Sequence, residues 1–188
     1  MNQTDLSNYL HSAAHRKDPI LKRILWFYIN AFIFKTSWLP FNWPKVQLLR
    51  LFGASVGSAV IIRPGVNIKH PWLFHIGNHS WIGENVWIDN LVSVHIGNHV
   101  CVSQGALLLT GSHNYKDPAF GLITAPIILE DGVWIGARTI VNLGITAGSH
   151  AVLAAGAVAT KDLDPWTVYQ GNPAFKIRSR SIHPDTQN

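Results

Sequence analysis

The chain has 188 residues, of which 47% are hydrophobic and 13% charged, and it carries 15 lysine and arginine residues against ten acidic ones. This balance excludes an intrinsically disordered protein, and the length is enough for one ordinary domain with a buried core. The single cysteine, Cys101, excludes an internal disulfide and the common four-ligand zinc motifs, and it suits a reducing compartment.

The excess positive charge lies in the first quarter of the chain. Residues 1–50 hold seven basic residues against two aspartates, whereas residues 51–160 hold four basic against five acidic residues. A nearly neutral body argues against a nucleic-acid partner, because nucleic-acid binding needs a basic working face on the folded domain. The basic, aromatic-rich beginning favours an anionic membrane surface instead. Residues 1–18 lack the apolar centre of a signal peptide, so we expect a cytoplasmic protein that can work at the inner face of the membrane.

Residues 18–39, DPILKRILWFYINAFIFKTSWL, predict a helix. Asp18 is a good capping residue and Pro19 suits the first turn, and the apolar residues that follow recur at helical spacing. The apolar run is too short to cross a bilayer, which needs roughly 20 residues. Two interpretations stay open: a helix packed on its own domain or on a neighbouring subunit, and a helix lying in the membrane interface. The basic residues that would meet lipid headgroups in the second interpretation are Lys22, Arg23 and Lys35.

A second short helix is predicted after Pro44, with Gly53 near its end, because proline begins helices readily and glycine ends them. The two helices together make residues 1–53 an N-terminal helical region. The pattern then changes, since the residues after this region no longer follow helical spacing.

From residue 54 to residue 163, an aliphatic side chain recurs every six positions. A period of six is typical of hexapeptide repeats in a parallel β-helix, where each hexapeptide gives one short strand and one turn. Neither an α-helix nor a hairpin meander produces this period. Three hexapeptides make one coil, which takes 18 or 20 residues. The predicted inward positions are Val56, Ile62, Ile68, Ile76, Ile82, Ile88, Ile96, Val102, Leu108, Leu129, Ile135, Val141, Ala147, Leu153 and Ala159.

Residues one coil apart should lie one strand spacing apart, roughly 4.8 Å. His75 is therefore expected to stack near His95, and His79 near His99. Two histidines are too few for a good metal site, and ladders of like side chains are the ordinary result of coil stacking. We expect no metal cofactor.

The six-residue period is interrupted within residues 107–126, LLLTGSHNYKDPAFGLITAP. An inserted loop over about residues 109–127 separates two hexapeptides there, and it contains His113. An interruption in a regular repeat is a frequent place for a functional loop. Since the ordinary pKa of histidine lies close to neutral pH, His113 is a candidate general base.

Four segments resemble the hexapeptide-repeat acyltransferases: TGSHNYKDP, ITAPIILEDGVWIGA, VLAAGAVATKD and QGNPAFKIRSR. Within that superfamily, RPGVNIKHPW, IGENVWIDN and TGSHNYKDPAF are most similar to the WcaF-type colanic acid O-acetyltransferases. The resemblance covers residues of about 20–180. It implies an all-β fold, a left-handed parallel β-helix over residues 54–163 with a C-terminal tail over residues 164–188. It also implies a homotrimer that binds acetyl-CoA and the acceptor between neighbouring subunits, with the inserted loop leaning across to the next subunit.

The activity that the resemblance implies is transfer of an acetyl group from acetyl-CoA directly to a sugar hydroxyl, in the synthesis of an exopolysaccharide. The acceptor would be a small or lipid-linked saccharide. His113 matches the loop histidine that acts as general base in the resembling enzymes. A neutral imidazole must be held in one tautomer through its other nitrogen, by a carboxylate or by a backbone carbonyl. Asp117 is near in sequence, and the orienting group stays open.

Three residues match the acceptor site of the sugar acetyltransferases. Asp89 and Asn90 match positions that contact the acceptor, and their carboxylate and amide groups suit neighbouring hydroxyls. Trp87 matches an aromatic residue whose flat ring suits the face of a pyranose. The alternative is a purely structural role, because Asp-Asn is also a favoured turn pair.

Five residues match the CoA site of the family. Ala137 and Ala155 would give main-chain contacts to pantetheine, and the Ala137 amide is a candidate for stabilising the oxyanion. Thr160 and Lys161 lie where the family holds the distal part of CoA, and Arg178 would close on its nucleotide end. Solubility is the alternative role of the lysine and the arginine.

Two other functions stay open. One is a metal-dependent hydratase like the γ-type carbonic anhydrases, which share this fold and need three histidines converging from neighbouring coils and subunits. His70 and His75 have a suitable spacing of five residues, but the CoA-type tail argues against this function. The other is a non-catalytic β-helix that serves as an oligomeric scaffold.

Overall fold

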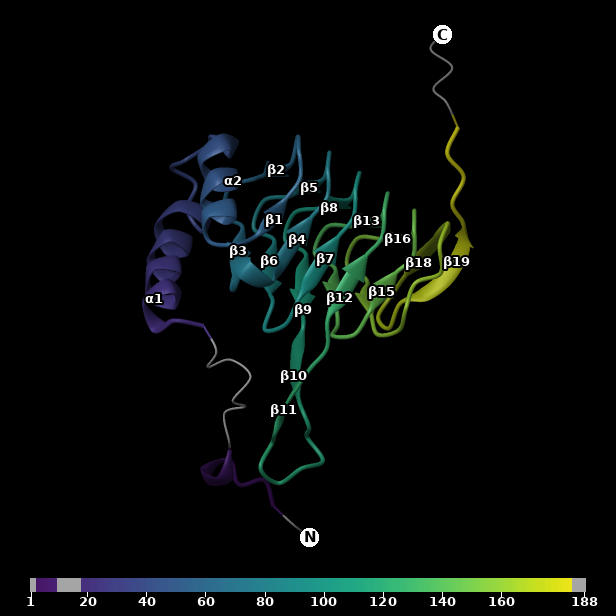
Figure 1. Cartoon of the computed structure of the whole chain (residues 1–188). Helices are drawn as coiled ribbons and strands as arrows, with labels where there is room; N and C mark the ends of the chain where they lie inside the picture. The colour runs from purple at the N-terminus through teal and green to yellow at the C-terminus, as the bar shows by residue number, and fades with distance from the viewer. Residues whose placement is uncertain (1–2, 10–17, 184–188) are drawn as a thin grey trace.

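The hexapeptides form the walls of a β-helix in the computed structural model, which describes residues 3–9 and 18–183 (Figure 1). Three parallel sheets, here called A, B and C, make these walls, and only β18 and β19 pair antiparallel within them. Successive strands of the chain pass from A to B to C, so each coil contributes one strand to each wall. The predicted parallel β-helix is confirmed.

The strands are short, as the repeat requires. Sheet A contains β1 (Ser55–Val56), β4 (Phe74–Ile76), β7 (Val94–Ile96), β12 (Ile127–Leu129) and β15 (Thr146–Ala147). Sheet B contains β2 (Ile61–Ile62), β5 (Trp81–Ile82), β8 (Cys101–Val102), β13 (Trp134–Ile135), β16 (Val152–Leu153), β18 (Thr167–Gln170) and β19 (Phe175–Ser179). Sheet C contains β3 (Asn67–Ile68), β6 (Trp87–Asp89), β9 (Leu107–Leu109), β14 (Ile140–Val141) and β17 (Val158–Ala159).

The core is the column of inward residues that the period of six predicts. Every predicted inward position except Val56 is buried, and Val56 packs against the same hydrophobic cluster. Coil stacking also places the histidine pairs as expected. The rings of His75 and His95 are parallel with centroids 4.4 Å apart, and those of His79 and His99 lie 5.1 Å apart.

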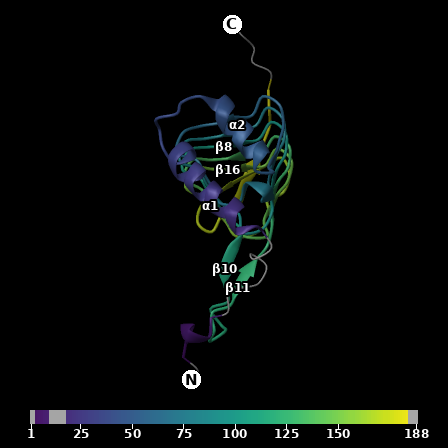
Figure 2. The same ribbon diagram turned by 60° about the vertical axis from the view of Figure 1, so that its left-hand side comes forward.

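Two helices lie across the end of the β-helix where the first coil begins (Figure 2). They are α1 (Ile20–Ile29), which continues into a π-helical turn η3 (Asn30–Phe34), and α2 (Asn42–Leu51). Two short 3-10 turns, η1 (Leu6–Asn8) and η4 (Pro71–Leu73), complete the helical elements of the described residues. The helices are needed because β2 and β3 are edge strands, whose unpaired backbone groups would otherwise be open to another chain.

Asparagine side chains from the helical region satisfy these edge strands. The Asn42 amide donates to the Val60 carbonyl at 2.7 Å and accepts from the Ile62 N–H at 2.7 Å. The Asn30 amide accepts from the Ile68 N–H at 3.4 Å and donates to the Asn67 side chain at 2.7 Å. Because a side-chain amide carries both a donor and an acceptor, it substitutes for the missing neighbouring strand. The first coil is therefore covered and bonded rather than left as an open edge.

Two details of the predicted helix starts are wrong. The N-cap of α1 is Pro19, which has no side-chain capping bond, so Asp18 does not cap this helix. Helix α2 begins at Asn42, two residues before Pro44. Proline is tolerated inside the first turn because the N–H groups of that turn have no intrahelical acceptor. Gly53 does follow the end of α2, with a φ of +95°.

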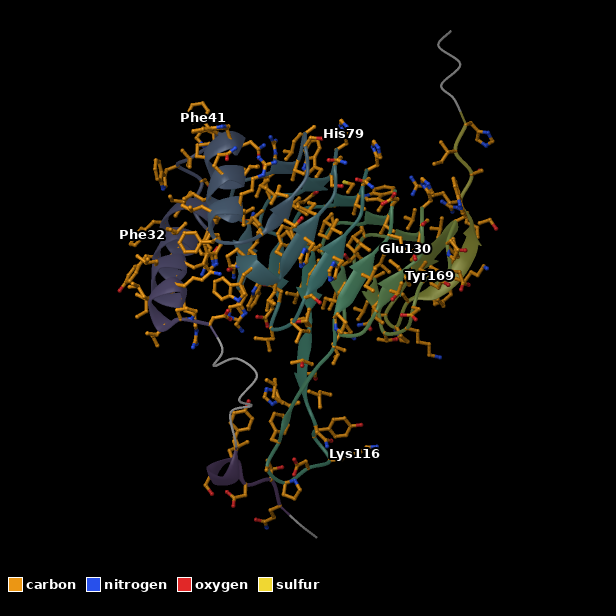
Figure 3. The ribbon with its side chains drawn as sticks, in the orientation of Figure 1. Phe32, Phe41, His79, Lys116, Glu130 and Tyr169 are labelled. Atoms are coloured by element: carbon orange, nitrogen blue, oxygen red, sulfur yellow. The ribbon has the colours of Figure 1, made fainter. Side chains whose placement is uncertain are left out.

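Helix α1 and the turn after it have two different faces. Trp26 and Phe34 are buried against the first coil, and the Trp26 indole donates to the Ile68 carbonyl at 2.8 Å. Ile20, on the other side, is 69% exposed, and Phe32 points away from the β-helix (Figure 3). Within residues 3–9 and 18–183, no helix has both the length and the apolar character to cross a bilayer. The inner face of α1 packs on its own domain, as the first interpretation expected. The second interpretation, contact with a membrane interface, concerns only the exposed outer face.

Lys45 is an unusual residue in the interface between α2 and the β-helix. Its side chain is 0% exposed, and its Nζ has no hydrogen-bond partner among the described residues. Burial lowers the pKa of Lys45 below its ordinary value, and the nearby charge of Arg63 lowers it further. A buried ammonium without a partner destabilises the folded state.

We expect Lys45→Met to raise the free energy of unfolding at pH 7 by about 1–3 kcal/mol, since it removes this unpaired group and keeps the packing. Because the pKa is lowered in the folded state, the wild-type chain loses stability as pH falls from about 10.5, the ordinary pKa, towards the folded pKa. The advantage of the variant should therefore shrink as pH rises towards 10.5. Urea unfolding at several pH values measures the difference in free energy of unfolding between the variant and the wild type. Lys35→Met, at an exposed position, is the control. A Lys45→Met variant less stable than the wild type would contradict this account.

Candidate active site

The inserted segment forms an antiparallel hairpin that projects from the β-helix (Figure 1). Strand β10 (Gly111–His113) pairs with β11 (Leu122–Thr124), with His113 opposite Leu122. The hairpin leaves the β-helix where the chain passes from sheet C to sheet A, between β9 and β12. His113 lies at the end of β10, and Lys116 lies near the far end of the hairpin (Figure 3).

The His113 ring is held in one tautomer. Its Nδ1 lies 2.9 Å from the carbonyl oxygen of Phe120. A carbonyl oxygen only accepts, so a neutral imidazole in this position carries its proton on Nδ1 and keeps a lone pair on Nε2. The Phe120 ring also stacks on the imidazole, with centroids 4.6 Å apart and an angle of 11°. Nε2 is therefore oriented to accept a proton.

The group that orients the His113 imidazole is thus a backbone carbonyl, and Asp117 instead stabilises the turn that carries this carbonyl. The Asp117 carboxylate accepts from the Ala119 N–H at 3.0 Å, and its carbonyl accepts from the Phe120 N–H at 2.9 Å. Phe120 itself has a φ of +52°, a conformation that is uncommon for a residue other than glycine. The turn built by Asp117 fixes this conformation, which aims the Phe120 carbonyl at His113.

A groove of about 300 Å³ lies at the base of the hairpin. It brings together His113 and Asp89, the predicted base and one of the predicted acceptor residues. Two residues that the sequence analysis missed, Lys69 and Tyr9, also line it. The full lining is Tyr9, Lys69, Asp89, Leu91, Gly111, Ser112, His113 and Leu122.

Lys69 forms an ion pair with Asp89, with Nζ and Oδ1 2.8 Å apart. Oδ1 is buried, and Lys69 is the one partner that the described residues give it. The coil spacing could have revealed Lys69, because it precedes Asp89 by one 20-residue coil. Tyr9, whose ring centroid lies 5.7 Å from that of His113, has no such signal in the sequence.

Asn90 is buried and bonded to the neighbouring coil. Its side chain is 0% exposed, its Nδ2 donates to the His70 carbonyl at 2.6 Å, and its Oδ1 accepts from the His70 N–H at 3.0 Å. Asn90 therefore joins two coils at their corner, a role that the structural alternative describes, and its contact with an acceptor stays a prediction. The Trp87 indole is 46% exposed on the outer face of sheet C and is not among the residues that line the groove.

The residues predicted for CoA binding lie on other parts of the surface. Ala137 and Ala155 follow β13 and β16 at the corner between sheets B and C, on successive coils. Their N–H groups have no acceptor among the described residues, and the Ala137 carbonyl accepts from the Gly156 N–H at 2.8 Å. A Cβ at Gly136 would lie 2.6 Å from the Ala155 nitrogen, so only glycine permits this close stacking. This corner offers two free backbone donors to a ligand.

The predicted phosphate-binding residues are all exposed. Thr160 and Lys161 follow β17, at the same corner as the hairpin but on a later coil. Arg178 lies on β19, opposite Val168 of β18. These positions leave the side chains accessible to a ligand, although within one chain they do not join the groove of His113.

The one chain therefore contains two separate groups of predicted residues. His113 and Asp89 meet at the corner between sheets C and A, whereas Ala137 and Ala155 lie at the corner between sheets B and C. The structure brings the members of each group together but does not bring the two groups together.

The histidines of the hydratase alternative are occupied by other contacts. The Nδ1 of His70 lies 2.9 Å from the Asn90 carbonyl, while His75 stacks on His95. Among residues 3–9 and 18–183, no three histidine, cysteine or carboxylate side chains converge to hold a metal ion.

Comparison with known proteins identifies the family. The chain is 36% identical over 179 residues to WcaF of Escherichia coli (strain K12), a protein named provisionally as a colanic acid biosynthesis acetyltransferase; the match covers 94% of this chain and 97% of WcaF. It is 31% identical to the galactoside O-acetyltransferase of the same organism, over 71% of this chain and 68% of that enzyme. A hexapeptide-repeat acetyltransferase of Vibrio cholerae, solved in complex with acetyl-CoA, superposes with a TM-score of 0.81 at 27% identity, over 94% of this chain and 96% of that one. No protein-family model matches the chain. The extent of these matches shows that the chain belongs to the hexapeptide-repeat acyltransferases, as an acyltransferase related to WcaF.

Proposed function

We propose that this protein transfers the acetyl group of acetyl-CoA to a hydroxyl of a saccharide, with His113 as general base. The observation that carries the proposal is the bond from His113 Nδ1 to the Phe120 carbonyl, which leaves Nε2 free at a groove that also contains Asp89. Two relatives support the donor and the acceptor: one structure contains acetyl-CoA, and one relative is named for acetylation of a galactoside. The WcaF relative supports a role in the synthesis of an extracellular polysaccharide.

The chemistry follows from the position of the imidazole. An acceptor hydroxyl donates a hydrogen bond to Nε2 of His113, and its oxygen attacks the thioester carbonyl carbon as the proton moves to Nε2. The Ala137 N–H stabilises the oxyanion of the tetrahedral intermediate. Breaking of the C–S bond releases the CoA thiolate, which takes the proton back from Nε2. The imidazole returns to its neutral form with no covalent enzyme intermediate.

In this proposal Asp89 binds the saccharide acceptor, and Ala137 and Ala155 bind acetyl-CoA. The Asp89 carboxylate, which Lys69 pairs through Oδ1, accepts a hydrogen bond from a second hydroxyl of the sugar at its other oxygen and so orients the acceptor. The free N–H of Ala155 donates to an amide carbonyl of pantetheine, as an added strand would, and the free N–H of Ala137 faces the acetyl carbonyl that becomes the oxyanion. Lys161 and Arg178 hold the phosphates of CoA, and Thr160 assists them. Trp87 remains a proposed outer contact to the acceptor.

We also infer a homotrimer. In it, the corner between sheets C and A of one chain, which carries the hairpin and His113, meets the corner between sheets B and C of the next chain, which carries Ala137 and Ala155. In a ring of three subunits every contact joins two different surfaces, so two corners separated within one chain can form one site. Exposed apolar side chains on the outer face of sheet B favour burial against another chain. They include Ile61, Trp81 and Trp134, which are 37%, 43% and 48% exposed. Analytical ultracentrifugation measures the oligomeric state.

The activity is tested by incubating the protein with acetyl-CoA and a panel of mono- and oligosaccharides, and by following the release of free thiol. The proposal expects thiol release that depends on a saccharide and survives addition of a chelator. Activity lost on chelation would favour the hydratase class, and failure to bind acetyl-CoA at all would favour a scaffold. A basic N-terminal region is consistent with work at the inner face of the membrane, on a lipid-linked saccharide.

A further inference from the structure

Helix α1 turns a broad apolar face away from the β-helix. Six of its ten residues are large apolar side chains that are 48–69% exposed: Ile20, Leu21, Ile24, Leu25, Phe27 and Tyr28. At roughly 100° per residue, these six side chains cover an arc of about 160°, and the centre of the arc lies opposite the buried Trp26. The arc is therefore the side of the helix that the first coil does not cover.

The apolar surface continues beyond α1, around the end of the β-helix. Phe32, Trp38, Phe41 and Trp43 are 63–71% exposed, and Phe32 and Phe41 both point away from the coils (Figure 3). The Trp38 indole and the Thr36 hydroxyl donate to the Phe32 carbonyl at 2.5 and 2.7 Å, so the polar groups of this turn are bonded to one another. Internally bonded polar groups enter an apolar medium at a lower cost than free ones. We call these four residues and the six of α1 the end face.

Basic residues outnumber acidic ones around the end face. Asp18 precedes α1, and no further aspartate or glutamate occurs before Glu84, whereas residues 19–83 hold seven lysines and arginines. Lys22 and Arg23 lie at the two borders of the apolar arc, and Lys35 is exposed where η3 ends. Basic side chains that border an apolar helix face are typical of a helix lying in an anionic membrane interface.

Two other occupants fit the end face less well. A second copy of the chain, related by a twofold axis, would bring Arg23 and Lys35 close to their own copies, and the end face contains no carboxylate to pair them. The next subunit of the inferred trimer meets corners of the β-helix, whereas α1 and α2 lie across its end (Figure 2). Large exposed apolar patches mark interaction sites, and an anionic bilayer matches both the apolar arc and its basic border.

We propose that the end face docks on an anionic phospholipid bilayer, with α1 lying in the plane of the membrane. The apolar arc enters the boundary between headgroups and acyl chains, and Trp38 and Trp43 lie at the level of the headgroups. Arg23 and Lys35 meet the lipid phosphates. None of the end-face residues lines the groove of His113. The inference names a partner for a different surface, so it goes beyond the proposed acetyl transfer and does not depend on it.

Vesicle sedimentation with the full-length chain tests the docking without acetyl-CoA or a saccharide, so failure of the transferase proposal would not affect the result. We expect binding to vesicles of phosphatidylcholine and phosphatidylglycerol in equal parts to be about tenfold tighter than binding to phosphatidylcholine alone, with a difference that shrinks as salt is added. Arg23→Gln should weaken binding to the mixed vesicles about fivefold. Lys116→Gln, which removes an exposed charge near the far end of the hairpin, is the control and should change little.

A second pair of variants tests the apolar contribution. Phe27→Gln should weaken binding to the mixed vesicles about tenfold, because the ring no longer enters the bilayer. Phe175 has a similar exposure, 62% against 66% for Phe27, but lies on β19 at the opposite end of the β-helix (Figure 1). Phe175→Gln should therefore leave vesicle binding unchanged. Thermal unfolding checks that both variants are folded.

Equal binding to the two kinds of vesicle would overturn the inference, and so would equal effects of the two variants in either pair. Analytical ultracentrifugation tests the competing occupant. If two trimers associate end to end, Phe27→Gln separates them, and the wild type binds no vesicles, the end face joins two copies of the assembly and the inference is wrong.

Discussion

His113→Ala is expected to lower kcat by about 10²- to 10⁴-fold, the usual contribution of a general base. The Nδ1 bond to the Phe120 carbonyl fixes the tautomer in which Nε2 accepts the proton of the acceptor. Without the imidazole, an alcohol at neutral pH must attack as the protonated nucleophile. Acetyl-CoA binding should change little, because none of the proposed CoA contacts is made by the His113 side chain.

The measurement is saccharide-dependent thiol release under saturating acetyl-CoA, with thermal unfolding as a check of the fold. His79→Ala is the matched control. The His79 ring is also exposed and stacks on another ring, that of His99, but it lies on a regular coil of the β-helix and far from the hairpin in sequence. Added imidazole should restore part of the activity of His113→Ala and none in the control. An alanine variant that keeps near wild-type kcat would remove His113 from the mechanism.

Ala155→Trp is expected to weaken acetyl-CoA binding by roughly 100-fold, by covering the surface beside two free backbone N–H groups. The predicted contacts are made by the backbone, so the side chain matters only through its size. Ala155→Ser should therefore bind acetyl-CoA almost as well as the wild type. Ala155 is exposed at a turn, so neither substitution should disturb the core.

Calorimetric titration with acetyl-CoA measures both variants, and thermal unfolding confirms that both are folded. The pair distinguishes a size effect from a general sensitivity of this coil. Equal loss of binding in the serine and tryptophan variants would argue against a main-chain site, and unchanged binding in the tryptophan variant would place CoA elsewhere.

The sequence predicted the β-helix well because one physical constraint repeats. Each coil must place an aliphatic residue inward every six residues, and the parallel stacking then places residue pairs such as His75 and His95 together. The same spacing rule could also have placed Lys69 beside Asp89. Within the repeats, the spacing of two residues along the sequence is enough to predict whether they are neighbours on successive coils.

The site was only partly predictable, because it lies where the repeat stops. The family resemblance singled out His113, but the Phe120 carbonyl that orients it depends on the turn geometry of the hairpin and carries no side-chain signature. The sequence also could not show that the Asn90 amide bonds to the backbone of the neighbouring coil, because an amide with that role has the same sequence pattern as one that binds a sugar. Tyr9 reaches the groove from far along the chain, which no local pattern indicates.

The central claim is that one active site takes its base from one chain and its CoA slot from the next. Refolding the His113→Ala and Ala155→Trp chains together in equal amounts tests it directly, at an acetyl-CoA concentration too low for either variant alone to show appreciable activity. In a random mixture of trimers, about one quarter of the sites should combine an intact His113 with an intact Ala155 slot, and about that share of wild-type activity should return. If mixed trimers form and stay inactive, both groups act within one chain and the claim is wrong.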